Sequence, residues 1–573
     1  MTSCIATVSL IDTTAHEDAS IDTMYNNTVG DLSLFDTDSE YTENINTTEL
    51  NRTVLDGTFT APSDFKVPFW STEKSEDDCT FLNTPSLIVK FSKAHTSVGI
   101  TLKFLEDYPS KILVSWYSDQ DGNVKIDSKS FYPNSTEYVC FKQVEGYKSI
   151  KIEFIKTRQP KQYIRMTFML YGEIRTWADE DVMKATVMEE VDSTSSTLPI
   201  NTAELTLVDE NDDFNIQNTE GLWKSLQAEQ KILLTENVNG TTLDVGTYYI
   251  DTWESRDNSI TLSLVDILGL IDKTKFMGGM YTDASVGDLI DSIMASANVT
   301  DYEVSADLKD LTLSGYIPIM SHREALQQIA FAVGAVVDST RGSTIRVHTP
   351  DKNIDSYILL DRKFSGKCSI TLDEYVSGVS ITCTKYKALS ETSEIYNGYL
   401  SVGTHKIEFA EPYTSLTCDG GTIESSGVNY AFVTSTGGDV ILSGIGYESS
   451  EYTVTKNVNV IEVGQIENVK SFSGLTIYNP SKLLDVAEQL LNWYALRQKV
   501  SLEYICNKEK VGEWVGIQDS LNQNSYSITR INSQTIDLCG GYLATAECRG
   551  YATIVSSYYY MGDELPMGTE GII

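Results

Sequence analysis

The sequence is poor in the residues from which metal sites and common catalytic centres are built. Its five histidines form neither an H-x-H nor an H-E-x-x-H motif, and its nine cysteines contain no C-x-x-C pair. These absences argue against a zinc hydrolase, a structural zinc site and a redox dithiol. No G-x-S-x-G motif is present, and no cysteine has a recognisable nucleophile context. We therefore predict no catalytic, cofactor-binding or metal-binding residues, no cofactor and no enzymatic activity.

Long apolar stretches are also missing. Nowhere do 18 apolar residues follow one another, and residues 1–10 lack a basic segment and a sustained apolar run. The sequence thus predicts neither a membrane-spanning helix nor a secretion signal. The odd number and wide spacing of the cysteines favour reduced thiols, mostly small core residues, in a protein assembled in a cytoplasm.

Basic residues are scarce relative to acidic ones. The chain has 43 Lys and Arg against 81 Asp and Glu, which gives a formal net charge of −38. A surface this acidic repels DNA and anionic membranes, so we expect neither stable nucleic-acid binding nor a membrane anchor. In an ordinary soluble protein such charge serves solubility. In a protein that lines a channel, it would also let DNA pass without adhering.

Residues that favour β-strands are abundant. Thr, Ser, Tyr, Val and Ile are frequent, and only a few windows show helical periodicity, so the composition predicts a β-rich protein. Hydrophobic residues make up 41% of the chain, which is ample for packed cores. The length predicts roughly three to five domains. Two amphipathic helices are expected, one over residues 285–299 and a longer one that begins at Pro480.

The most informative segment is residues 313–338. An extended stretch leads to Ser321, which forms a capping box with Glu324 and therefore predicts that a helix begins there. Gly334 ends the helix, and a hairpin returns through Thr344–His348. The apolar face of the helix consists of Ala325, Leu326, Ile329, Ala330 and Val333. Its polar face carries no pair of catalytic groups, so we interpret the segment as a rigid brace.

This strand, helix and hairpin resemble the small α+β module of baseplate hub and tail-tip proteins of tailed phages or phage-tail-like particles, especially those of Gram-positive hosts. Residues 189–201, 248–254 and 265–274 are similar to the first barrel of the same family. The resemblance extends from about residue 172 to residue 385 and is weak between 388 and 469. Its motifs are structural signatures, and none of them is a catalytic motif.

Upstream, short alternating strands with polar turns predict a jelly-roll-like β-sandwich, which is similar to galactose-binding-like modules. The expected fold class is mainly β with a smaller α+β module flanked by two hub-type β-barrels. The predicted order is an N-terminal acidic arm or strands (1–57), the galactose-binding-like β-sandwich (58–172), the first hub β-barrel (173–281), the α+β module (282–350), the second hub β-barrel (351–557) with an inserted β subdomain (about 387–469), and a C-terminal arm (558–573).

One segment imitates a calcium-binding loop. Asp209, Asn211 and Asp213 occupy loop positions one, three and five, and Glu220 occupies the last position. Phe214, however, stands at position six, where the sharp turn of such a loop requires glycine. We therefore interpret the segment as a solvated acidic turn.

Two further groups of residues invite a functional interpretation. Trp70, Trp116, Tyr117 and Tyr132 could form an aromatic platform for sugar, but alternate positions of a sandwich normally face the core, which favours packing. His322 lies in the first turn of its helix, where a histidine is more often a surface or interface residue than a catalyst.

The resemblance implies a structural hub protein of a phage tail tip or baseplate. Such a protein forms a homotrimeric ring that surrounds the channel and joins the hexameric tail tube to the distal spike or fibre apparatus. The implied partners are further copies of the chain, tail tube or distal tail proteins, the tape measure protein, and spike or fibre proteins. The implied location is a virion or tail-like particle assembled in the bacterial host cytoplasm.

Two alternatives remain open from the residues. The β-sandwich could make the chain an adhesin that binds host cell-wall glycan. A peptidoglycan hydrolase is less favoured, because a glycosidase needs only two carboxylates but no pair among the 81 acids stands out by context.

Overall fold

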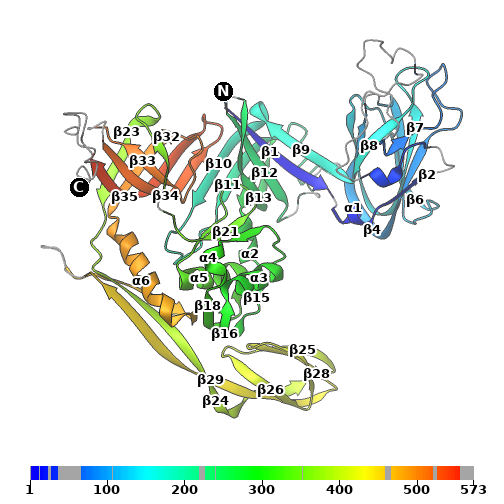
Figure 1. Cartoon of the computed structure of the whole chain (residues 1–573). Coiled ribbons are helices and arrows are strands. Elements are labelled where there is room, and N and C mark those ends of the chain that lie inside the picture. Colours follow the sequence, from blue (N-terminus) through cyan, green and yellow to red (C-terminus); the bar gives the residue numbers. More distant parts are fainter. Residues whose placement is uncertain are drawn as a thin grey trace.

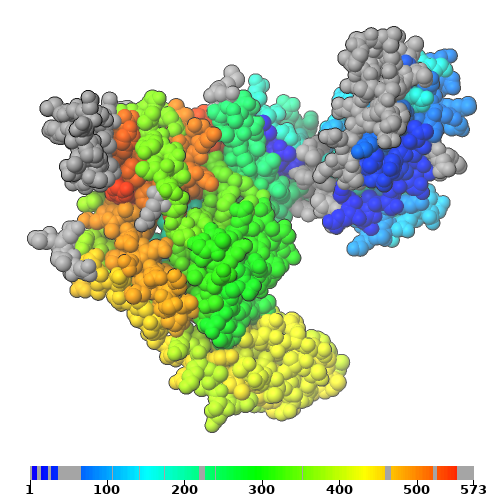
Figure 2. Space-filling model, in the orientation of Figure 1, coloured from blue at the N-terminus to red at the C-terminus, as the bar shows by residue number. Residues whose placement is uncertain are grey.

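The computed structural model describes residues 2–11, 13–23, 28–35, 49, 66–105, 108–218, 223, 226, 228–238, 240–351, 353–458, 466–520 and 525–554. Strands predominate and helices are few, which confirms the predicted mainly β fold class. Figure 1 shows a central body with one lobe beside it and another below it. The space-filling view shows the same three masses (Figure 2).

A 13-stranded sheet forms the upper part of the central body. Its main path runs β23 (Lys363–Leu372), β32 (Gln498–Ile505), β35 (Leu543–Ile554), β34 (Ser525–Asp537), β10 (Val182–Glu190), β11 (Thr202–Val208), β14 (Ser259–Val265), β13 (Thr241–Arg256), β12 (Lys231–Val238), β1 (Thr2–Ile11) and β9 (Gly172–Ala178). β33 (Trp514–Gln518) pairs with β34 and with β22 (Ile354–Ile358). We call this the large sheet, with a first half from β10 to β9 and a second half from β34 to β23 together with β22 and β33.

The two halves of the large sheet are continuous. β10 pairs with β11 on one side and with β34 on the other, although β10 and β34 are more than 300 residues apart in the chain. A single core cluster includes buried residues of both halves, such as Leu205 and Leu502. The predicted closure of each half into a barrel stays a prediction.

The N-terminal residues join two different sheets. β1 lies between β12 and β9 in the large sheet, so the strand alternative, and not a free arm, holds for residues 2–11. After α1 (Thr13–Asp18), β2 (Ser20–Thr23) pairs with β4 of the neighbouring lobe. Leu32–Leu34 form a short 3-10 helix. Residues 36–48, 50–65 and 555–573, which include part of the predicted N-terminal segment and all of the predicted C-terminal arm, lie outside the described residues.

The N-terminal lobe is built on a second sheet of seven strands. Its path is β3 (Phe69–Trp70), β8 (Arg165–Leu170), β4 (Ser86–Phe104), β7 (Glu137–Lys156), β5 (Lys111–Tyr117) and β6 (Lys125–Phe131), with β2 paired to β4. The long strands β4 and β7 change register several times along their pairing. Such β-bulges bend a strand, which helps one sheet enclose a core. The turn between β5 and β6 is held by Asp119, which accepts hydrogen bonds from the backbone of Asn123 and Val124.

A helical module lies beneath the large sheet (Figure 1). Its helices are α2 (Ile267–Asp272), α3 (Val286–Ser296), α4 (Ala306–Lys309) and α5 (His322–Val333). Three small sheets complete it: β16 (Gly279–Ser285), β18 (Thr312–Ile317) and β31 (Ile477–Tyr478); β17 (Tyr302–Val304), β21 (Ile345–His348) and β20 (Val336–Asp338); and β15 (Lys275–Phe276) with β19 (Met320–Ser321).

The predicted helix and hairpin of this module are confirmed. Ser321 and Glu324 form the complete capping box, and Gly334 ends α5 in the left-handed conformation with φ of 68°. β20 and β21 pair as the predicted hairpin. A Cβ atom at this position would lie 2.6 Å from Oε1 of Gln489, so the end of that side chain would have to shift.

A long antiparallel ribbon carries the distal lobe away from the body. It consists of β24 (Gly378–Leu400) and β29 (Gly438–Asn457), with β26 (Tyr413–Asp419) and β30 (Val469–Leu475) on its sides. The distal strands β25 (Gly403–Glu408), β28 (Tyr430–Ser435) and β27 (Thr422–Ser426) form a small sheet. The predicted long helix is α6 (Pro480–Ala495), which packs against α5 and the ribbon.

Candidate functional site: a buried ionic junction

In the segment that imitates a calcium-binding loop, the carboxylates form hydrogen bonds and an ion pair within the protein. Asp209 is fully buried, and its two oxygens accept hydrogen bonds of 2.9 Å from the backbone N–H groups of Asp213 and Phe214. Burial raises the pKa of Asp209. Asp213 forms an ion pair of 3.0 Å with Arg175. The oxygens therefore stabilise the turn, while Glu220 lies outside the described residues.

Of the two alternatives given for His322, a surface or an interface residue, the surface alternative is wrong. It is 2% exposed, with Nδ1 2.8 Å from Oγ1 of Thr274 and Nε2 3.0 Å from Oγ of Ser296. The first residue of α5 points toward α2 and α3, which enclose it, and burial lowers its pKa. We conclude that the neutral imidazole joins three parts of the helical module.

The four candidate sugar-binding aromatics do not share one environment. Trp116 is fully buried and Tyr117 is 9% exposed, which confirms the packing prediction for these two. Trp70 is half-buried beside the guanidinium of Arg165, 4.8 Å from its ring. Tyr132 is 63% exposed.

The cysteines agree with the prediction of reduced thiols. All nine are free, and five of them are buried. Over the part of the chain that the structure describes, no three His, Cys, Asp or Glu side chains are grouped so that they could hold a metal ion. Within the same residues, no helix is both long enough and apolar enough to span a membrane.

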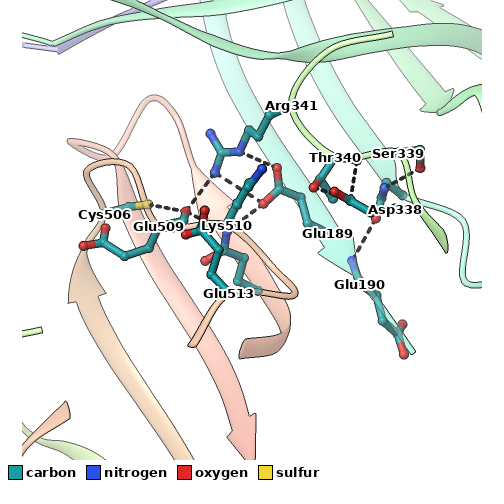
Figure 3. A network of polar contacts seen from close by, with 12 residues as sticks. Glu189, Glu190, Asp338, Ser339, Thr340, Arg341, Cys506, Glu509, Lys510 and Glu513 are labelled. Carbon is teal, nitrogen blue, oxygen red and sulfur yellow. Dashed lines mark hydrogen bonds and ion pairs between the residues drawn. The ribbon is translucent and has the colours of Figure 1, made fainter. Parts of the chain in front are cut away.

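A buried polar cluster joins the first half, the helical module and the second half (Figure 3). Glu189 of β10 is 1% exposed, and its Oε1 lies 2.7 Å from Nε of Arg341, which is in the loop between β20 and β21. Gln534 of β34 donates a hydrogen bond of 2.6 Å to Oε2 of Glu189. Arg341 also donates one of 2.6 Å to the hydroxyl of Tyr542, just before β35. These four residues and Glu509 form what we call the junction.

Glu509 extends the junction to the loop between β22 and β23. Its backbone carbonyl accepts hydrogen bonds from Arg341 and Gln534. Its carboxylate receives both Nη atoms of Arg362 at 2.7 Å, a bidentate pair that lowers its pKa against the opposing effect of burial. Bidentate pairs fix geometry as well as charge.

Burial and pairing act in opposite directions on the charges of the junction. Burial raises the pKa of Glu189, and Arg341 and Gln534 counteract it. The pKa of Arg341 is raised by the same carboxylate. Cys506 is the nucleophile nearest to this cluster, but burial raises its pKa to about 11, which keeps the thiol protonated. The junction is therefore suited to hold elements together, and its thiol is not activated.

A second buried network lies beside the junction. Ser339 donates a hydrogen bond of 2.7 Å to Asp266, and Asn201 donates one of 3.2 Å to Ser339. Asn201 in turn accepts one from the backbone of Glu190. Asp266 also caps α2, and burial raises its pKa to about 6. The first half and the helical module are thus connected twice.

The polar face of α5 makes structural contacts on two sides. Gln327 donates a hydrogen bond of 2.7 Å to the carbonyl of Ser195, in the loop after β10. Gln328 donates one of 3.3 Å to Gly474 and accepts one from the backbone of Thr476. These contacts support the interpretation of the helix as a brace.

The junction was not predicted from the sequence, although Glu189 lies in the segment 189–201 that resembles the first barrel. One clue was available, because Ala185, Val187 and Glu189 alternate along one strand, and the first two are core residues. A carboxylate at a core-facing position requires a partner. The identity of that partner, Arg341, depends on a contact between residues about 150 positions apart, which no local pattern indicates.

Comparisons with known proteins give structural similarity only. No protein-family model and no curated protein match the sequence. A tail protein from Neisseria meningitidis MC58 has a TM-score of 0.41 at 11% identity, over 65% of this chain and 93% of that one. The prophage MuSo2 43 kDa tail protein from Shewanella oneidensis has a TM-score of 0.38 at 12% identity, over 66% and 95%.

A third similar structure is the prophage tail protein gp18 from Listeria monocytogenes EGD-e. Its TM-score is 0.37 at 8% identity, over 65% of this chain and 91% of that one. At TM-scores and identities this low, these similarities carry no argument about function.

Proposed function

We propose that the chain is a structural hub protein of a phage tail tip or baseplate. Three copies form a ring around the channel and join the hexameric tail tube to the distal spike or fibre apparatus. The neighbours in this role are tail tube or distal tail proteins, the tape measure protein, and spike or fibre proteins. Its work is mechanical, and the proposal includes no catalytic activity.

The observation that carries the proposal is the rigid connection between the two halves and the helical module. The sequence resemblance covers about residues 172–385, and within this span lie β10, α5 and Arg341. A hub must transmit force between a tube and a spike without bending. The continuous sheet, the ion pair between the partly buried Arg341 and the buried Glu189, and the hydrogen bonds of α5 are suited to that task.

The net charge also suits this role. At −38 per chain, a ring of three copies would present a strongly acidic surface to DNA in its channel. Like charges repel, so the passing phosphate backbone would not adhere to the wall.

Mass photometry of the purified full chain, together with detection of the chain in purified tails, tests this proposal. We expect a species of three copies and a signal at the tail tip. Monomers alone at every concentration, combined with absence from tails, would contradict it.

An adhesin role for the N-terminal lobe is a second candidate, favoured by the exposure of Tyr132. Sugar rings stack on exposed aromatic faces, and Tyr132 offers one at 63% exposure. The burial of Trp116 removes one member of the predicted platform. A glycan array probed with the full chain and with Tyr132→Ala tests this role. Binding that Tyr132→Ala abolishes supports it, and equal or absent binding contradicts it.

A further inference from the structure

A cavity of about 690 Å³ lies between α6 and the second half of the large sheet, where Figure 1 shows the helix beneath the strands. Cavities of about 300–1,000 Å³ are typical of sites for small ligands. The lining contains the rings of Trp493, Trp514 and Tyr551 together with charged and amide side chains. Aromatic rings beside convergent polar groups are typical of a site for a polar ligand that has a flat apolar face.

The register of the second half brings four lining residues to one face of the sheet. Trp514 of β33 lies opposite Arg530 of β34. Two positions earlier in β34, Ile528 lies opposite Tyr551 of β35. Opposite residues of an antiparallel pair project to the same face, as do residues two apart in one strand, so the sheet presents two rings and a guanidinium toward α6. The indole N–H of Trp514 donates a hydrogen bond of 2.8 Å to the carbonyl of Asp351, which fixes the orientation of that ring.

The opposite wall of the cavity is a single stripe of α6. Residues at intervals of three or four share one face of a helix. The lining residues of α6 follow these intervals: Asp485, Glu488, Gln489, Asn492, Trp493 and Leu496. Trp493 does not belong to the core cluster that the buried residues of α6 join. Packing of the core therefore does not explain why this stripe carries an indole ring.

Two buried hydrogen-bond donors that line the cavity lack partners for their polar atoms. Arg530 is 3% exposed, and its Nε donates a hydrogen bond of 2.6 Å to the carbonyl of Gly512, but within the described part of the chain its two Nη atoms make none. Ser193 is 8% exposed, and its hydroxyl has no partner among the same residues. A buried polar group without a partner is costly. The two donors thus favour a ligand that carries hydrogen-bond acceptors.

The charges that line the cavity are of both signs. Asp351, Asp485 and Glu488 contribute carboxylates, two of which already pair with lysines, and Arg530 contributes a guanidinium. A simple anion would be repelled by the carboxylates, and a simple cation by the guanidinium. A hydroxyl group donates a hydrogen bond to a carboxylate and accepts one from a guanidinium. A neutral ligand with many hydroxyl groups therefore suits this lining better than a charged one.

We propose that the cavity between α6 and the second half binds a short neutral saccharide. The apolar face of a sugar ring stacks on the indole of Trp493, while its hydroxyl groups accept hydrogen bonds from Arg530 and Ser193 and donate them to the carboxylates of the lining. This site lies in the central body, apart from Tyr132 of the N-terminal lobe. It depends neither on the hub role nor on the adhesin role of that lobe.

A glycan array that carries neutral, anionic and cationic saccharides, probed with the full chain, tests the class of ligand. We expect binding to neutral saccharides, which calorimetry with the soluble oligosaccharide then measures. The trimer of N-acetylglucosamine and its deacetylated, cationic form are a pair that differs in charge on the same backbone. Binding of charged saccharides only, or of no saccharide, would overturn the proposal.

Substitutions in the full chain test the place of binding. Trp493→Ala should weaken the affinity about tenfold or more, because the stacking surface is lost. Ser193→Ala removes a hydroxyl that has no partner in the described protein, so it should keep the fold and weaken the affinity about threefold to tenfold. Tyr399→Ala, at a residue 68% exposed in the distal lobe, is the matched control and should change nothing. Unchanged affinity in Trp493→Ala, or loss of binding in Tyr132→Ala, would overturn the assignment.

Hydroxyl-radical labelling followed by mass spectrometry gives a second readout that needs no substitution. Saturating neutral saccharide should reduce the oxidation of Trp493 and Tyr551, because the bound ligand covers their rings. Trp253, which is 38% exposed on β13 in the first half, is the control and should be oxidised to the same extent with and without saccharide. Equal oxidation of Trp493 and Tyr551 in both conditions would contradict the proposal.

Discussion

Two glutamates of the large sheet are both buried, but different groups lie opposite their carboxylates. Glu189 on β10 and Glu236 on β12 are 1% and 0% exposed. Glu189 meets Arg341 and Gln534, whereas neither oxygen of Glu236 makes a well-formed hydrogen bond within the described residues. A buried carboxylate is costly unless it is paired or protonated. Glu189 is therefore held by a charged partner, Arg341, whereas no cation is among the groups that shift the pKa of Glu236, so the contribution of Glu236 to stability depends on its proton.

The surroundings of Glu236 explain its behaviour. It lies directly opposite Cys4 of β1, and burial raises its pKa to about 7. Asp179 raises this pKa further, and the Ser3 amide offsets the increase only in part. Cys539 is also near, and the pKa values of both thiols are raised by burial. No cation among these groups compensates the charge, so the seam between β1 and β12 should be sensitive to pH.

The strongest test of the pair between Arg341 and Glu189 is Arg341→Met. Removing the guanidinium leaves Glu189 buried without its charge partner, which we expect to lower the free energy of unfolding by about 3–5 kcal/mol. Guanidinium denaturation followed by circular dichroism measures this loss. Arg256→Met is the matched control, because its pair with Glu254 is exposed at 69% and 63%, and it should cost about 0–1 kcal/mol. A loss for Arg341→Met no larger than that of the control would break the comparison.

Arg362→Ala should have the next largest effect. Its bidentate partner Glu509 is 3% exposed, but Arg362 itself is 24% exposed, so water replaces part of the lost contact. We expect a loss of about 2 kcal/mol in the same denaturation experiment. A loss equal to that of Arg341→Met would show that burial of the arginine does not decide the cost.

Glu236→Gln should raise the free energy of unfolding at high pH, whereas the two arginine substitutions should lower it. The folded-state pKa of about 7 lies above the ordinary value of 4.5, so the folded chain holds this proton more tightly than the unfolded chain does. The stabilising contribution is present at low pH and is lost as the pH rises from about 4.5 to about 7. At about pH 8 we expect Glu236→Gln to be more stable than the unaltered chain by about 1–2 kcal/mol. Denaturation curves at several pH values test this, and an unchanged pH dependence would contradict it.

Ser321→Ala measures how much a polar contact at the surface contributes to the free energy of unfolding. It removes one half of the capping box of α5, with a loss of about 1 kcal/mol. Glu324→Gln retains the hydrogen-bonding shape and should cost less. If Ser321→Ala cost as much as Arg341→Met, the distinction between surface and buried contacts would fail.

Local features of the fold could be predicted from the sequence, and distant pairings could not. The capping box and Gly334 determine where α5 begins and ends, and both depend on residues within one short segment. The position of β1 between β12 and β9 depends on partners about 170 and 230 residues away. The burial of His322 could not be predicted for the same reason, because α2 and α3 enclose it from outside its own helix.

The central claim is tested most directly by a cryo-EM map of the intact tail tip of a particle that contains this chain. The proposed function predicts three copies around the channel, with the large sheet and the helical module in contact with tube and spike proteins. A map in which the chain is absent from the tip, or is present only as a peripheral fibre, would contradict it.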